Sequence, residues 1–151
     1  MALEWLKQRY SEVSANLKSE VTKFKNKSFL EAVVAGCALV AHADGVVRPE
    51  EKQKMMGFLR NSEMLSVFGT DEIITLFDKY AKQFEFDHQI GQASALQAVA
   101  KLKDKEAEAR LMVRVCCAVG AADGNFDDQE KAVARKICAE LGLNPKDFDL
   151  A

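Results

Sequence analysis

The stretch that most constrains the fold is residues 28–45, which read SFLEAVVAGCALVAHADG. Ser28 and Glu31 have the spacing of a capping box, in which each side chain satisfies a backbone group of the other. A run rich in Ala and Val follows, and Asp44-Gly45 ends it, because glycine tolerates the left-handed conformation found after many helices. The stretch therefore predicts an apolar helix over residues 28–43.

Helical signals continue on both sides of this stretch. Apolar residues at steps of three and four predict a long amphipathic helix from Leu3 to Phe24. Start and stop signals predict further helices from Pro49, over 70–84, over 88–102 after the cap Asp87, from about 105 to 122, and over 128–141, with a short turn after Asn144. No stretch has the pattern of a strand. We therefore expect an all-α, seven-helix single domain over residues 1–151.

The chain contains an internal repeat. Adding 79 to the residue number carries Cys37 onto Cys116, Asp44-Gly45 onto Asp123-Gly124, and Glu51 onto Glu130. The same shift carries the first helix onto the fifth, so the chain divides into three-helix units of about 3–61 and 87–142 with the fourth helix between them. Two such units usually pack about an approximate two-fold axis. We expect the two apolar helices, 28–43 and about 105–122, to form the core.

Composition excludes several classes of protein. The 21 Lys and Arg residues nearly balance 23 Asp and Glu, a formal charge of −2, which argues against a globally basic nucleic-acid binder. The uncharged apolar stretch of residues 32–43 is far shorter than the roughly 20 residues that span a bilayer. The N-terminus lacks the pattern of a secretory signal, so we expect a cytoplasmic protein.

The four cysteines lie in apolar helical patterns. None forms a C-x-x-C pair, so we expect them to be small buried hydrophobes in a reducing compartment. They are Cys37, Cys116, Cys117 and Cys138.

The two interhelical turns carry the strongest functional signal, the motif D-G-x5-E. Capping explains part of it, because Asp127 and Glu130 have the spacing of a capping box. Asp44 and Asp123, however, fall at helix C-termini, where the helix dipole disfavours an anion by roughly 0.3–1 kcal/mol. A hard cation would offset this cost, and oxygen ligands favour Ca²⁺ or Mg²⁺. We therefore expect these turns to bind a divalent cation.

Two other functions remain open for these turns. One is a metal-free acidic surface that docks basic partner proteins. The other is a metal-dependent enzyme, which predicts a pocket beside the turns. No phosphate-binding loop or Ser/His/Asp grouping supports an enzyme, and nothing near the cysteines lowers a thiol pKa.

Secondary candidates are histidine, aromatic and lysine side chains. His42 is either a structural histidine or an auxiliary ligand beside Asp44, and His88 is structural or solvated. Phe84 and Phe86 favour core packing, with Asp87 as an alternative contributor to an acidic patch. The lysines of the first helix form a solvated face or contact an anionic membrane surface, with Trp5 and Leu6 inserted; they are Lys18, Lys23, Lys25 and Lys27.

Several motifs together resemble the TerB family of tellurite-resistance proteins. They are the doubled D-G-x5-E, EEKQKMMGFLR at residues 50–60, KNK at 25–27 and GNFDD at 124–128. The resemblance implies an all-helical cytoplasmic protein that associates with the inner face of the membrane in a stress system. It supplies no catalytic activity.

The resemblance also implies partners and a ligand set. The partners are the integral membrane protein TerC and calcium-binding proteins of the TerD type. The acidic residues proposed to bind divalent cations in the family correspond to Asp44, Glu51, Asp123, Asp127 and Glu130. The first turn departs from the pattern at Arg48-Pro49, which replaces two carboxylates.

Overall fold

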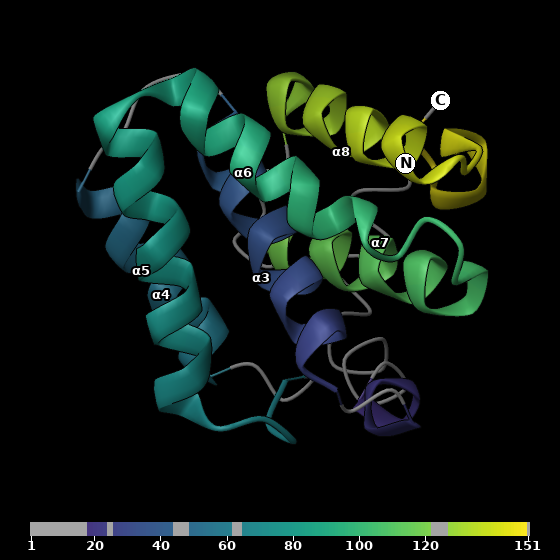
Figure 1. The fold of residues 1–151 in the computed structure, drawn as a ribbon, viewed down its shortest axis with the longest axis horizontal. Coiled ribbons are helices and arrows are strands. Elements are labelled where there is room, and N and C mark those ends of the chain that lie inside the picture. The colour runs from purple at the N-terminus through teal and green to yellow at the C-terminus, as the bar shows by residue number, and fades with distance from the viewer. Residues whose placement is uncertain (1–17, 24–25, 44–48, 62–64, 122–126, 151) are drawn as a thin grey trace.

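The computed structural model describes residues 18–23, 26–43, 49–61, 65–121 and 127–150. Residues 18–23 are helical, and six α-helices and a 3-10 helix have assigned bounds (Figure 1): α3 (Lys27–Ala41), α4 (Pro49–Asn61), α5 (Thr70–Phe86), α6 (His88–Ala100), α7 (Glu106–Ala121), α8 (Asp128–Leu141) and η1 (Pro145–Phe148). These ranges contain no strand, which confirms the all-α prediction for them. Within the same ranges, no helix combines the length and hydropathy needed to cross a membrane.

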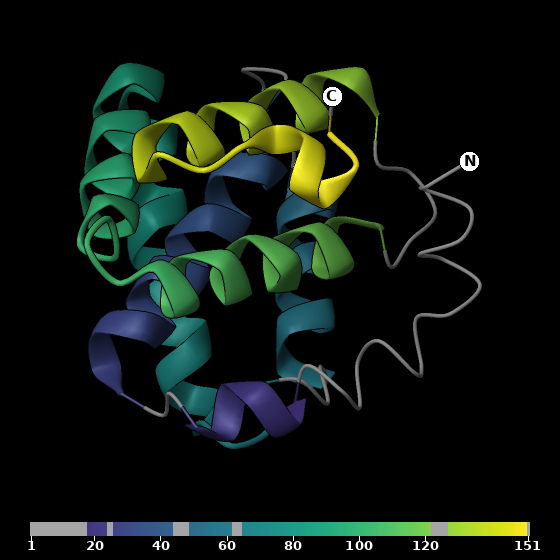
Figure 2. The same ribbon diagram turned by 90° about the vertical axis from the view of Figure 1, so that its right-hand side faces the viewer.

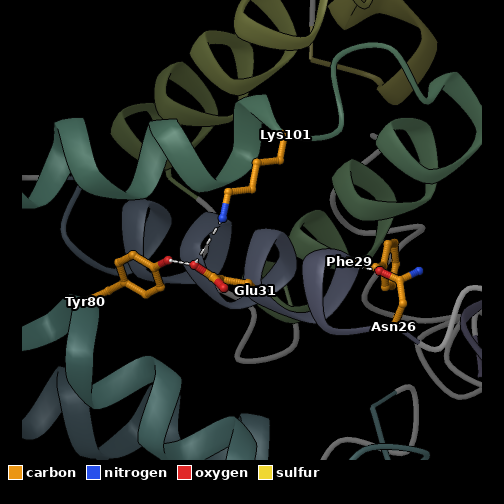
Figure 3. A network of polar contacts seen from close by, with 5 residues as sticks. All are labelled: Asn26, Phe29, Glu31, Tyr80 and Lys101. Carbon is orange, nitrogen blue, oxygen red and sulfur yellow. Dashed lines mark hydrogen bonds and ion pairs between the residues drawn. The ribbon is translucent and has the colours of Figure 1, made fainter.

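The start of α3 differs from the prediction. Asn26 caps the helix, and its side-chain oxygen accepts a 2.9 Å hydrogen bond from the backbone N–H of Phe29. The predicted capping box of Ser28 and Glu31 is therefore wrong, because Ser28 already lies inside the helix. Asparagine is among the best N-cap residues, so the earlier position takes the cap. Glu31 is instead bound by the Tyr80 hydroxyl (Figure 3).

α3 is the central helix of the fold. It contacts each of the helices α4 to α8, and nearly all of its residues between Phe29 and Val40 are buried. Figure 1 shows α3 behind α6, with α4 and α5 on one side and α7 and α8 on the other. Figure 2 shows α8 and η1 lying over α7. The predicted contact between the two apolar helices, now α3 and α7, is present, but the core extends to α5, α6 and α8 as well.

The close approach of α7 to α3 depends on Gly36. A Cβ atom at this position would lie 2.6 Å from Cε of Met112 and 2.7 Å from Sγ of Cys116. These distances are too short for any real Cβ contact, so a larger residue would require the side chains of Met112 and Cys116 to shift. The small residues of α3 thus set how near its neighbours pack.

The helix bounds follow the sequence repeat. Adding 79 to the number of Lys27, the first residue of α3, gives Glu106, the first residue of α7. The same shift relates Pro49, the first residue of α4, to Asp128, the first residue of α8. Most of the first predicted helix, residues 3–24, lies outside the described residues. The seven-helix count and the two-fold relation of the units therefore stay predictions.

Candidate functional site

Three of the five predicted metal ligands cannot be placed from the described residues. Asp44 and Asp123 lie outside the described ranges, and Glu51 lies in α4 with its side chain outside the description. The described residues contain no group of three or more His, Cys, Asp or Glu side chains that could hold a metal ion. A complete ligand set would therefore need side chains from the two acidic turns.

Asp127 and Glu130 form the predicted capping box at the start of α8. The Asp127 carboxylate accepts a 2.8 Å hydrogen bond from the Glu130 N–H, and the Glu130 carboxylate accepts one of 3.1 Å from the Asp127 N–H. This pairing confirms the capping prediction. It also holds both carboxylates at the positive end of the α8 dipole, which stabilises negative charge there.

The structure contains a pocket of about 490 Å³. It is lined from α3, α5, α6 and α8, and its wall reaches Ala43, next to Asp44, and Gln129, next to Glu130. Its polar lining consists of imidazole, amide and cationic side chains: His42, His88, Gln92, Gln129, Arg135 and Lys136. No Asp, Glu, Ser or Cys is among the described residues that line it.

The pocket wall contains a group of three rings that the sequence analysis did not assemble. The ring of His42 stacks on that of Phe84, with centroids 4.5 Å apart and planes 3° from parallel. The ring of His88 is tilted against the same Phe84 ring, with centroids 5.3 Å apart. His42 is 3% exposed, and its Nδ1 lies 2.8 Å from the carbonyl oxygen of Ala38. Because a carbonyl only accepts, Nδ1 of His42 carries the hydrogen and donates it. Burial, stacking and this hydrogen bond hold His42 in place at the end of α3, and its role as an auxiliary ligand stays a prediction.

The aromatic pair near Asp87 has two different environments. Phe84 is buried, as expected for core packing, whereas Phe86 is 82% exposed, so the core prediction is right for Phe84 and wrong for Phe86. Asp87 caps α6, as predicted, and its carboxylate accepts hydrogen bonds from the N–H groups of Gln89 and Ile90 at 2.8 and 3.1 Å. Phe84 and Phe86 both lie in α5, where positions two apart point to different sides of the helix, so Phe86 faces away from the core when Phe84 faces into it.

All four cysteines are buried and free of disulfides, which confirms the prediction that they act as small hydrophobes. A hydrogen bond with Cys37, together with burial, raises the pKa of Cys116 well above its usual value. Burial raises the pKa of Cys117 to about 12 and that of Cys138 to about 11. Neutral thiols are poor nucleophiles, so these side chains are suited to packing at neutral pH.

The described residues define a small all-helical protein with a pocket between α3, α5, α6 and α8. Comparison with known proteins narrows this class. The chain belongs to the TerB family, because residues 30–151 match the family profile described as tellurite resistance protein TerB. It is similar to the tellurium resistance protein TerB of an Alcaligenes species, with 46% identity over 99 residues that cover 66% of this chain and 81% of that protein. No solved structure matches it.

Proposed function

We propose that this chain acts in tellurite resistance as a non-enzymatic scaffold in the cytoplasm. In this proposal its paired acidic turns bind a divalent cation, and it docks partner proteins at the inner face of the membrane. Membership of the TerB family supports the link to tellurite resistance. The cation and the partners rest on the physical arguments that follow.

The charge at the helix ends supports cation binding. Neither α3 nor α7 carries a basic residue in its last turn, so neither negative C-terminal dipole is offset there by Lys or Arg. The sequence places Asp44 and Asp123 shortly after these two ends, which concentrates further negative charge. The capping box holds Asp127 and Glu130 at the start of α8. Carboxylate and carbonyl oxygens are the ligands that Ca²⁺ and Mg²⁺ prefer.

Titration of the full chain with calcium and magnesium by calorimetry tests the cation site. Asp123→Ala and Glu130→Ala should each weaken binding by about tenfold or more, a loss of about 1.4 kcal/mol. The matched control is Glu140→Ala, an exposed carboxylate at the far end of α8, which should bind as the unmodified chain does. Since Glu130→Ala also removes the capping box, its stability is measured without metal. Unchanged affinity in both site variants would contradict the assignment.

The docking proposal has a metal-dependent and a metal-free form. The partners that we propose are a membrane protein of the TerC type and calcium-binding proteins of the TerD type. Binding of a labelled peptide from a cytoplasmic loop of the TerC-type protein is measured by fluorescence anisotropy in calcium and in chelator. Loss of binding in chelator supports the cation-dependent scaffold. Binding that persists in chelator and weakens with salt supports a metal-free acidic docking module.

Peripheral membrane contact is the third element of the proposal. Lys23 and Lys27 are exposed at the helical N-terminal segment and the start of α3, and each basic side chain near an anionic surface contributes about 1 kcal/mol to binding. Co-sedimentation with anionic vesicles should weaken in Lys23→Gln and Lys27→Gln. Equal sedimentation with zwitterionic vesicles would argue against an electrostatic contact.

A further inference from the structure

We propose that the pocket between α3, α5, α6 and α8 binds a small organic anion, with its negative group beside Arg135 and Lys136 and its apolar part against Phe84. We call it the histidine pocket, after His42 and His88. The inference does not depend on the cation site, because it is argued from the lining residues of α3, α5, α6 and α8 and not from the acidic turns. It adds a ligand site to the proposed scaffold function.

The size of the pocket argues for an organic ligand. Its volume of about 490 Å³ lies within the roughly 300–1,000 Å³ that is typical of small-molecule sites. An inorganic oxyanion alone would leave most of this space to water. Apolar side chains from three helices, Leu39, Phe84 and Val133, would contact the body of a larger ligand.

The charge of the lining selects the sign of the ligand. Arg135 and Lys136 bring two positive charges to the wall, and none of the described lining residues is acidic. One guanidinium nitrogen of Arg135 donates a 3.1 Å hydrogen bond to the carbonyl oxygen of Leu150, which anchors this side chain. A guanidinium carries five N–H donors, so Arg135 retains donors for an anion. The amides of Gln92 and Gln129 add neutral donors to the same wall.

His88 gives an independent indication of a ligand. Its Nδ1 is buried and has no hydrogen-bond partner among the described residues. Buried polar atoms in native proteins are nearly always paired, and the exceptions need an explanation such as a missing water or ligand. His88 lines the pocket, and its buried Nδ1 is an unexplained polar atom behind this wall.

The experiment uses phenyl phosphate as the probe, because it joins an anionic group to a flat apolar body. The full ¹⁵N-labelled chain is titrated in chelator, so that failure of the cation site cannot affect the result. We expect saturable shifts in the amides of residues 88–92 and 129–136. Inorganic phosphate and tellurite, which lack the apolar body, should each bind about tenfold more weakly. Absence of shifts in these two segments, or equal affinity for either inorganic ion, would overturn the proposal.

Variants of α8 test the location. Ala132→Phe places a large side chain at the wall from an exposed position and should abolish saturable binding. Ala139→Phe is the matched control, because Ala139 is also exposed on α8 and does not line the pocket. Lys136→Gln should weaken binding by up to about fivefold, the effect of losing one partly solvated charge, and Lys146→Gln should not. Binding that survives Ala132→Phe unchanged would place the ligand elsewhere.

Discussion

The carboxylate of Glu31 connects three helices through two other side chains. The Tyr80 hydroxyl donates a 2.9 Å hydrogen bond to Oε1 of Glu31, and Nζ of Lys101 lies 3.8 Å from the same oxygen (Figure 3). Glu31 lies in α3, Tyr80 in α5, and Lys101 is the C-cap residue of α6. Burial and the hydrogen bond to Glu31 raise the pKa of Tyr80 above its ordinary value, so the phenol stays protonated and remains a donor. The network is therefore structural.

Tyr80→Phe tests this network at the scale of one atom. The change removes the donor and leaves a partly buried carboxylate with Lys101 as its remaining partner in the network, so the free energy of unfolding should fall by about 1–2 kcal/mol. Urea denaturation measures the change. The control is Lys82→Gln, which breaks the exposed pair of Lys82 with Asp78 and should cost less than about 0.5 kcal/mol. Equal losses in the two variants would show that the network contributes no more than a surface pair.

At the scale of the element, the same residue type has opposite roles in α3 and α4. A Cβ atom at Gly36 in α3 would collide with side chains of α7, whereas one at Gly57 in α4 would meet no atom of the described residues within 4 Å. Glycine in an open helical position destabilises the helix, because it loses more backbone entropy on folding than alanine does. Substitutions at these two positions therefore distinguish the effect of packing on stability from the effect of helix propensity.

Replacing each glycine by alanine should shift stability in opposite directions. Gly36→Ala should destabilise the protein by about 1–3 kcal/mol, because Met112 or Cys116 must move. Gly57→Ala should stabilise it by about 0.5–1 kcal/mol, because alanine is the better helix former. Thermal denaturation of both variants beside the unmodified chain gives the two signs. A stabilising effect of Gly36→Ala would mean that α3 and α7 pack less closely than described.

At the scale of the whole molecule, three helices bring the four thiols into one core. Cys37 lies on α3, Cys116 and Cys117 on α7, and Cys138 on α8. Burial raises the pKa of Cys117 and of Cys138 above their ordinary value of 9.0. The folded state thus favours the neutral thiols, and this contribution to stability is fully present below the pKa of the unfolded chain.

The free energy of unfolding should therefore decrease as the pH rises from about 9 to about 11. The unfolded chain loses its thiol protons in this range, while the folded chain retains them until the pH passes about 11 for Cys138 and about 12 for Cys117. Urea denaturation at a series of pH values measures the slope. Cys117→Ala, which removes one of these thiols, should give a shallower decrease. A parallel decrease in the variant would assign the pH dependence to other groups.

Local patterns in the sequence determined the helices and most of their ends. Asp87 and Asp127 cap α6 and α8, and Gly142 follows α8 with φ of 72°, as their spacing and residue types predicted. These signals work from sequence alone because each capping bond joins residues only a few positions apart. The start of α3 differs, because Asn26 caps the helix two residues before Ser28, which was the predicted cap.

The tertiary structure alone decided which distant side chains meet. It pairs Glu31 with Tyr80, 49 positions along the chain, and it forms the histidine pocket from four helices. No local pattern encodes such contacts, because they depend on how the helices pack and on the volumes that fit between them. The sequence by itself thus determined the helices, the caps and the family motifs, whereas packing determined the pocket and its charge.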